Sequence, residues 1–143
     1  MKRLLMYFLL FAPLTMLAPA CSDNDLYNEM PEEILQFVAQ YYPNTQLEEF
    51  THSGDIYHLR LRHGPGMTFG KDYEWIAVNG YGQVLPQVFL FDCLPPALYE
   101  YLQSTESTDQ VYSVDRDTDR YTVMTLNDTI VYERKTGRIT ESD

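Results

Sequence analysis

The amino-acid sequence predicts an α+β fold, in which a helix followed by four antiparallel strands occurs twice and the two units join into one eight-stranded sheet. Two observations predict it. A pattern with helical periodicity occurs at Met30 and again at Leu94, 64 residues later. Alternating strand patterns follow both copies at the same offset, beginning at Asp55 and at Asp119. Repeated elements in the same order indicate a duplicated unit of roughly 50 residues.

The two helical segments read MPEEILQFVAQYY from Met30 and LPPALYEYLQS from Leu94. In each, a proline stands where the first turn of a helix tolerates it, and apolar residues follow at i, i+3 and i+4. These apolar positions are Ile34, Phe37, Val38 and Tyr41 in the first copy, and Leu98, Tyr101 and Leu102 in the second. We therefore expect two short amphipathic helices, each burying a single stripe.

The strands are predicted by alternation. DIYHLRLRHG from Asp55 matches DRYTVMTLND from Asp119, and MTFGKDYEWIAV from Met67 parallels IVYERKTGRIT from Ile130. One more strand, QLEEFT or QVYSVD, precedes each group. In the Asp55 segment, Tyr57, Leu59 and Leu61 point one way, whereas His58, Arg60 and Arg62 point the other.

One such unit, with a short helix and a small sheet, would be only marginally stable on its own in water. Two units can join their sheets and place both helices on a common face, which makes one core. The second face of the sheet then has no cover from this chain. That bare face is where we expect function.

Residues 1–20 are predicted to be a signal peptide. Lys2 and Arg3 precede an apolar run from Leu4 to Leu17, which is shorter than the about 20 residues that a spanning helix needs. The sequence LAPAC resembles a bacterial lipobox, which implies lipid attachment at Cys21 after cleavage. The alternative is an ordinary cleaved signal, with Cys21 a free or paired thiol. Residues 21–29 are assigned to an acidic, hydrated tether.

Cleavage at residue 20 removes 2 of the 10 basic residues, so 8 remain against 21 acidic ones and the net charge becomes −13. Such a field repels nucleic acid and anionic lipid surfaces, so we expect neither as a partner. Lipidation of Cys21 would leave Cys93 without an intramolecular mate. Its apolar setting, FLFDCLPP, favours an inert buried thiol, and the sequence assigns it no role.

The repeat resembles the PepSY-like, beta-lactamase-inhibitor-like family of small exported bacterial lipoproteins, over Met30 to Asp143. The first copy carries the pattern at Met30-Pro31, Tyr57, Leu59, Leu61, Gly64, Phe69 and Trp75. The second carries it at Leu94-Pro95, Tyr121, Val123, Thr125, Tyr132, Gly137 and Ile139. The resemblance implies a curved antiparallel eight-stranded sheet with both helices on one face. In the inhibitor relatives, the concave sheet grips a partner enzyme.

On this basis residues 30–143 form one PepSY-like domain, with repeat one at 30–80, a connector at 81–93 and repeat two at 94–143. The chain departs from the family pattern at Tyr73, where the first copy usually has a turn glycine, and at His63 to Gly66, an apparent insertion that predicts a bulge or a widened hairpin. The connector, GYGQVLPQVFLF, is longer and more apolar than a simple linker.

Catalytic and metal-binding patterns are weak. His52, His58 and His63 would have to converge from a strand and its two ends, so we expect no metal centre. Asp115, Asp117 and Asp119 lack the glycine and the distal glutamate of a calcium loop, and fit a solvated turn. Cys93 has no histidine closer than thirty residues, and the Glu32–Glu33 and Glu48–Glu49 pairs diverge on a helix or strand. We predict no enzyme activity and no cofactor.

Binding is better supported, because 11 tyrosines and one tryptophan remain after cleavage, and both residue types are frequent in protein interfaces. His58, Arg60 and Arg62 form a cationic stripe, which is either ordinary strand decoration or, with Trp75 or Tyr112 on neighbouring strands, a contact for an acidic partner. The sequence does not determine which face Trp75 takes, and it favours the core over the open face.

The leading hypothesis is a non-enzymatic protein-binding or inhibitory module, lipid-anchored in the outer membrane and facing the periplasm or the cell surface. Its partner would be an envelope protein or peptide, held on the open sheet face. A structural or sensor subunit of an envelope complex is the alternative. An enzyme acting on glycans or peptides is the third hypothesis and would require a deep pocket with convergent polar groups.

Overall fold

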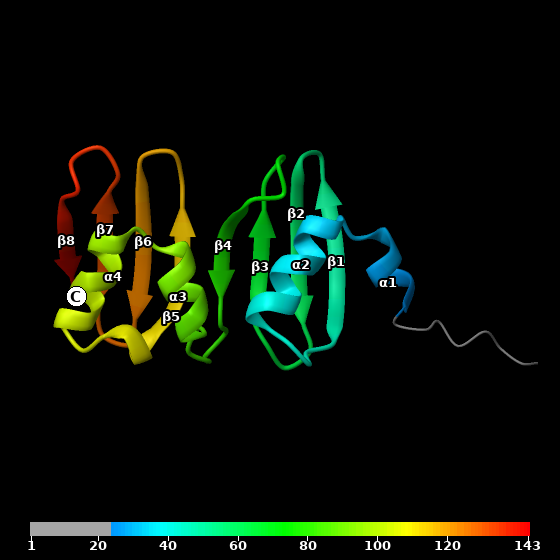
Figure 1. The fold of residues 1–143 in the computed structure, drawn as a ribbon, viewed down its shortest axis with the longest axis horizontal. Coiled ribbons are helices and arrows are strands. Elements are labelled where there is room, and N and C mark those ends of the chain that lie inside the picture. The colour runs from blue at the N-terminus through cyan, green and yellow to red at the C-terminus, as the bar shows by residue number, and fades with distance from the viewer. Residues whose placement is uncertain (1–23) are drawn as a thin grey trace, which may run out of the picture.

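The structure is a computed structural model that describes residues 24–143 (Figure 1). Eight antiparallel strands form one sheet, and their order in the sheet is their order in the sequence. The strands are β1 (Leu47–Ser53), β2 (Ile56–Leu61), β3 (Gly66–Phe69), β4 (Trp75–Asn79), β5 (Val111–Arg116), β6 (Arg120–Thr125), β7 (Thr129–Glu133) and β8 (Ile139–Ser142). The predicted signal peptide and Cys21 lie outside the described residues.

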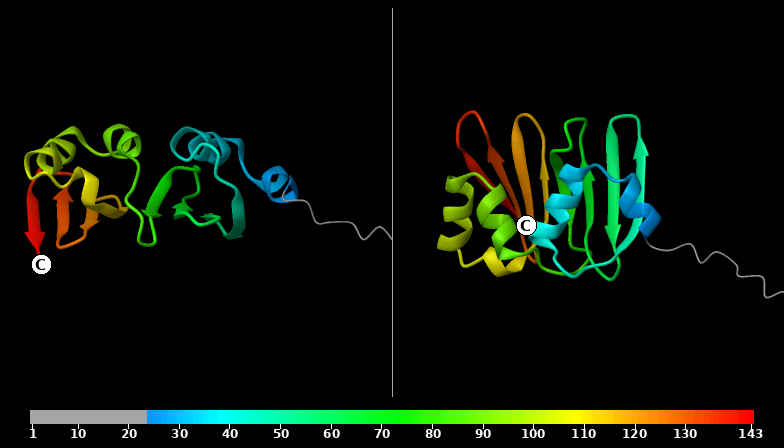
Figure 2. Two further views of the ribbon diagram at one scale, coloured as in Figure 1. Left: turned by 90° about the horizontal axis from the view of Figure 1, so that it is seen from below. Right: turned by 45° about the vertical axis from the view of Figure 1, so that its right-hand side comes forward.

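The helices are α1 (Asn24–Glu29), α2 (Glu32–Tyr41), α3 (Gln87–Cys93) and α4 (Pro96–Ser104), with a 3₁₀ turn η1 (Thr108–Gln110) before β5. Helices α2, α3 and α4 lie on one side of the sheet, and the left view of Figure 2 shows no helix of the described residues on its other side. Helix α1 lies beside β1, at the edge of the sheet (Figure 1). The predicted α+β fold, with two helix-plus-four-strand repeats in one sheet, is therefore confirmed.

The two predicted helices form for the reasons given by the sequence. Pro31 and Pro95 both have extended backbone immediately before α2 and α4, and neither helix has a side-chain cap at that end. In α2, Glu32 and Glu33 occupy the first turn, where the positive end of the helix dipole favours a carboxylate. Each helix buries one apolar stripe, as predicted.

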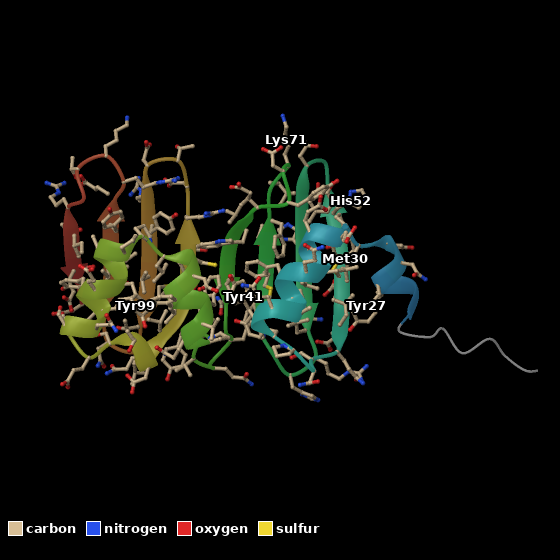
Figure 3. The ribbon with its side chains drawn as sticks, viewed as in Figure 1. Tyr27, Met30, Tyr41, His52, Lys71 and Tyr99 are labelled. Carbon is tan, nitrogen blue, oxygen red and sulfur yellow. The ribbon has the colours of Figure 1, made fainter. Side chains whose placement is uncertain are left out.

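Two helices were not predicted. Helix α3 lies inside the segment assigned to the connector, where it buries Phe89 and Leu90 completely. Helix α1 lies in the segment assigned to the tether, and Leu26 and Tyr27 pack partly buried against the core. The hydroxyl of Tyr27 accepts a hydrogen bond from the backbone N–H of Leu47 at 3.0 Å, at the edge of β1 (Figure 3). Residues 24–29 are thus folded onto the domain.

The core lies between the helices and the sheet and is shared by both repeats. Phe37 of α2 packs edge-on against Phe89 of α3, with ring centroids 6.0 Å apart, and Phe89 packs in turn against Trp75 of β4 at 5.2 Å. Aromatic pairs in such edge-to-face geometry contribute about 0.5–1.5 kcal/mol beyond the area they bury. The first repeat thereby packs onto the connector helix.

The two predicted departures from the family pattern have simple backbone explanations. Tyr73 adopts the left-handed conformation, with φ of +59°, and Gly137 has φ of +69° at the matching turn of the second repeat. A tyrosine therefore takes up a conformation that a glycine adopts at lower cost. Residues 62–65 connect β2 to β3, whose register is regular, so the predicted insertion is a widened hairpin turn and not a bulge.

Candidate functional site: the open face of the sheet

Two rows of side chains cross the open face of the sheet, and each row takes one residue from every strand. Strand pairing aligns the first, which we call the Thr68 row, as Thr51, His58, Thr68, Ala77, Asp115, Thr122, Val131 and Thr140. It aligns the second, the Gly66 row, as Glu49, Arg60, Gly66, Asn79, Ser113, Met124, Thr129 and Ser142. Between them runs a row that includes the buried Leu59, Val78 and Val123. Since neighbours alternate faces, both flanking rows point away from the core.

The middle of both rows carries short side chains, which leave a shallow hollow of about 360 Å³ over β1 to β5. Its lining includes Gly66, Thr68 and Ala77. Tyr81, which follows β4 and is 69% exposed, stands against one end of the hollow: a Cβ added to Gly66 would lie 2.7 Å from the Tyr81 ring. A glycine at position 66 therefore makes room for the tyrosine ring above it.

A second hollow, of about 400 Å³, lies over β5 and β6 and shares Asn79 with the first. Met124 and Leu126 line it and are 47% and 70% exposed, and Tyr112 and Ser113 complete it. Sequence reasoning missed this apolar corner. The signal for Met124 was available, because it has the opposite parity to the buried Tyr121 and Val123.

The predicted cationic stripe is only partly in place. His58 and Arg60 are exposed on the open face, and His58 Nδ1 lies 3.2 Å from the Thr68 hydroxyl. The Arg60 guanidinium forms ion pairs with Glu48 at 3.2 Å and Glu49 at 3.1 Å. Arg62 follows the end of β2 and donates to the Gln46 side-chain oxygen at 2.7 Å. Two carboxylates thus surround the one guanidinium in the Gly66 row.

Trp75 and Tyr112 have different fates. Trp75 is 6% exposed and belongs to the core, the place that the sequence favoured, and its proposed contact on the open face is wrong. Tyr112 lines the second hollow and is half-buried, but β5 is not a neighbour of β2 in the sheet, so the structure does not bring Tyr112 together with His58 and Arg60. Cys21, the predicted lipid-attachment residue, lies outside the described residues.

On the helix side, a polar contact joins α2 to α3. The Tyr41 hydroxyl donates to Asp92 Oδ2 at 3.3 Å and accepts from the Cys93 thiol at 3.5 Å, and Figure 3 shows Tyr41 between the two helices. Burial raises the pKa of both Tyr41 and Cys93. Cys93 is half-buried in this contact, whereas the sequence predicted a buried thiol, and its inertness stays a prediction.

The candidate metal ligands do not converge. His52 pairs with Tyr57 and shares its parity, whereas His58 points to the opposite face. Asp117 accepts the backbone N–H groups of Asp119 and Arg120, which lowers its pKa and makes the segment a turn, as predicted. Between residues 24 and 143 no group of three or more metal-ligating side chains gathers. None of the helices in that range has the length and apolar character needed to cross a membrane.

No protein-family model and no curated protein matches this chain. Solved structures do. A candidate periplasmic protein of the DUF2874 family from Bacteroides vulgatus ATCC 8482 is similar with a TM-score of 0.69, at 19% identity, over 81% of this chain and 92% of its own. A candidate calcium-regulated periplasmic protein from Bacteroides thetaiotaomicron is similar with a TM-score of 0.67, at 20% identity, over 81% of this chain and 92% of its own.

A BLIP-like protein from Bacteroides fragilis NCTC 9343 also matches, at 15% identity over 83% of this chain and 91% of its own, but its TM-score of 0.32 carries no argument. At these identities the likenesses show the fold alone. They agree with the two-repeat architecture expected from the family resemblance. The PepSY-like and lipoprotein assignments remain predictions.

Proposed function

We propose that this chain is a membrane-anchored, non-enzymatic protein-binding or inhibitory module of the bacterial cell envelope, with the open face as its docking surface. One observation carries the proposal: no element between residues 24 and 143 covers this face on any of the eight strands (Figure 2), and the face holds short side chains beside exposed apolar ones. Large exposed apolar side chains next to a polar rim are typical of interaction sites. The candidate periplasmic proteins that share this fold support an envelope location.

Two features of the open face favour binding over catalysis. Its hollows are shallow, whereas enzyme pockets enclose most of a substrate and gather polar groups of shifted pKa. The first hollow does place a hydroxyl beside a base, since His58 Nδ1 lies 3.2 Å from the Thr68 hydroxyl. Among residues 24–143, however, no third group orients that imidazole, as a nucleophile–base pair requires.

The docking surface is tested by blocking it. The mature domain is immobilised, an extract of the native envelope is passed over it, and retained proteins are identified by mass spectrometry. Ala77→Arg and Thr122→Arg fill the middle of the Thr68 row with a long side chain. Val88→Arg is the matched control, since Val88 is 56% exposed on α3, in the helix layer.

The expected result is a specific protein retained by the wild type and by Val88→Arg, and lost from both open-face variants. Circular dichroism of each variant establishes that it is folded. Retention that survives both open-face substitutions, or that Val88→Arg removes equally, would contradict docking on this face. Self-association that disappears with the open-face variants, with no other protein retained, would favour a structural subunit instead.

Membrane anchoring has its own test. Cys21 of the full chain is replaced by serine and the protein is expressed in its native envelope. The wild type should partition into the detergent-soluble membrane fraction and carry acyl chains at its N-terminus by mass spectrometry, because two or more chains anchor a protein stably. The Cys21→Ser variant should lose both. Unmodified Cys21 in the wild type would refute lipidation and leave the docking proposal standing.

A further inference from the structure

The charges on the open face have an imbalance that the sequence alone did not show. Four titratable side chains stand in the part of the two rows that lines the first hollow: Glu49, His58, Arg60 and Asp115. Arg60 is paired with Glu49 and also with Glu48. Two carboxylates therefore neutralise the one arginine, and none of its charge remains to pair with the Asp115 carboxylate.

Asp115 lies in the middle of the sheet, and no cation of the described part of the chain lies beside it. Its strand neighbours in the Thr68 row are Ala77 on β4 and Thr122 on β6, neither of which carries a charge. Within residues 24–143, no hydrogen bond or ion pair engages its carboxylate. The surrounding sheet partly removes water from it, which raises its pKa. An unpaired, partly desolvated carboxylate is less stable than one that has a cation next to it.

Exposed apolar side chains lie one step away along the strands. Ser113 precedes Asp115 by two residues on β5 and pairs with Met124 on β6. Two residues along a strand on one face correspond to about 6.6 Å. Met124 and Leu126 line the second hollow at this end. Met124 is also one strand away from Asp115, about 4.8 Å across the sheet, so the two positions are diagonal neighbours about 8 Å apart. Side chains at positions i and i+2 of an extended chain lie on one face and can reach both.

We propose that the open face selects an extended segment of a partner protein that carries a lysine or arginine two residues from a large apolar side chain, with the cation on Asp115 and the apolar side chain on Met124 and Leu126. The inference rests on the proposed function and adds the chemistry of the partner. The inferred partner is cationic, whereas the His58–Arg60–Arg62 stripe predicted an acidic one.

Charge complementarity favours this occupant over others. The mature chain has a net charge of −13, which attracts cationic segments and repels anionic lipid. A second copy of this chain would bring its own Asp115 and the same excess of acids toward the first. A cationic side chain on Asp115 would also remove the cost of leaving that carboxylate unpaired.

The test uses labelled peptides and the mature domain, with binding followed by fluorescence anisotropy at physiological ionic strength. The first peptide repeats Leu-Ser-Lys-Ser three times, so that leucine and lysine share one face of an extended chain. The second replaces every lysine by glutamate, and the third replaces every leucine by serine. Asp115→Asn and Met124→Ser remove the two proposed contacts. Glu100→Gln is the control, because it removes the same charge from an exposed position on α4.

The leucine–lysine peptide should bind about tenfold more tightly than either of the others. Asp115→Asn and Met124→Ser should each weaken it about fivefold or more, while Glu100→Gln changes its affinity by less than about twofold. Equal weakening by Glu100→Gln would mean that only net charge matters, and would overturn the inference. Tighter binding of the glutamate peptide, or no binding of any peptide, would overturn it too.

The two proposals fail separately. The envelope extract tests docking with whatever partner the cell supplies, whereas the peptides test the chemistry of that partner. Suppose that the extract yields a protein retained through the open face, but that the domain prefers the glutamate peptide. The proposed function would then stand, and the inference that its partner is cationic would be refuted.

Discussion

Arg116 lies over the ring of Trp75, with its guanidinium carbon 4.2 Å from the ring centroid, and its Nε donates to the Trp75 carbonyl oxygen at 2.6 Å. Trp75 belongs to β4 and Arg116 to β5, the strands through which the two repeats join their sheets. Trp75 also packs against Phe89 of the connector helix and Tyr121 of the second repeat. One side-chain pair thus contacts both halves of the duplication.

Replacing Arg116 by alanine is expected to lower the free energy of unfolding by about 2 kcal/mol. The loss combines a partly buried cation–π contact with a hydrogen bond from a charged donor, each of which contributes about 1 kcal/mol or more. Urea unfolding followed by tryptophan fluorescence measures it directly, since Trp75 is the one tryptophan of the chain. Arg120→Ala, at an exposed arginine in the next strand, is the control and should cost less than about 0.5 kcal/mol. Equal losses would contradict the role given to the junction.

The pairing of Trp75 also shows where sequence reasoning succeeds and where it stops. Alternation correctly assigned Leu59 and Leu61 to the core and His58 and Arg60 to the open face, because β2 itself contains no extra residue. Its register with β3 is unbroken, and the bulge in its pairing with β1 lies at Glu48 on β1. Trp75 and Val78 are both buried although they are three residues apart. Simple alternation would place them on opposite faces.

A break in register between β3 and β4 explains the burial of Trp75. Thr68 pairs with Ala77 and the adjacent Phe69 with Trp75, so β4 contains one extra residue at Ile76. A similar break at Tyr112 lets Val111 and Val114 both face the core. Bulges of this kind depend on pairing with the neighbouring strand, which one segment of sequence does not reveal.

The connector helix escaped prediction for a related reason. The segment Gln87–Cys93 makes only about two turns, which is too short to form a helix by propensity alone. It is stabilised by what it buries, since Phe89 contacts Phe37, Tyr41 and Trp75, all on other elements. Its apolar character was visible in the sequence, but its helical conformation depends on the side chains of other elements against which it packs.

The turn after β4 depends on the absence of a side chain at Gly80. A Cβ added at Gly80 would lie 1.9 Å from the carbonyl oxygen of Gln83. The backbone N–H of Gly80 also donates a hydrogen bond to the Tyr112 carbonyl oxygen at 2.8 Å. Gly80→Ala must therefore displace backbone that holds β4 to β5, and should cost about 2–3 kcal/mol.

Gly54→Ala is the matched substitution for Gly80→Ala. Gly54 has φ of +58° and nothing within 4 Å of an added Cβ, so it should lose only about 1 kcal/mol through backbone strain. Thermal and urea unfolding of the two variants give the comparison. A smaller loss at Gly80 than at Gly54 would show that the turn relaxes freely.

Replacing tyrosine by phenylalanine is expected to have opposite effects on the free energy of unfolding at two positions, Tyr42 and Tyr27. Within residues 24–143 the buried hydroxyl of Tyr42 has no hydrogen-bond partner, and burial raises its pKa. Tyr42→Phe removes this unsatisfied group and should increase the free energy of unfolding by about 1 kcal/mol.

Tyr27→Phe removes instead the hydroxyl that accepts the Leu47 N–H, and should lower the free energy of unfolding by about 1 kcal/mol. Urea unfolding of the two variants side by side provides the measurement. A loss of stability in both variants would contradict the prediction for Tyr42. It would mean that the Tyr42 hydroxyl has a hydrogen-bond partner, such as a bound water.

The unpaired carboxylate on the open face predicts a pH dependence of stability. The pKa of Asp115 is raised above its ordinary value of 3.8 by partial desolvation. As the pH rises from below 3.8, the unfolded chain releases this proton before the folded one does, so the folded state loses stability relative to the unfolded state. Asp115→Asn removes the charge and should be more stable than the wild type at pH 7. The difference should vanish below pH 3.8, where the aspartate is protonated in both states. Urea titrations across this range measure the difference in the free energy of unfolding, with Glu100→Gln as the control.

An Asp115→Asn variant that is less stable than the wild type at pH 7 would contradict this prediction. It would mean that the chain itself stabilises the Asp115 carboxylate, which removes the argument that a partner supplies the cation.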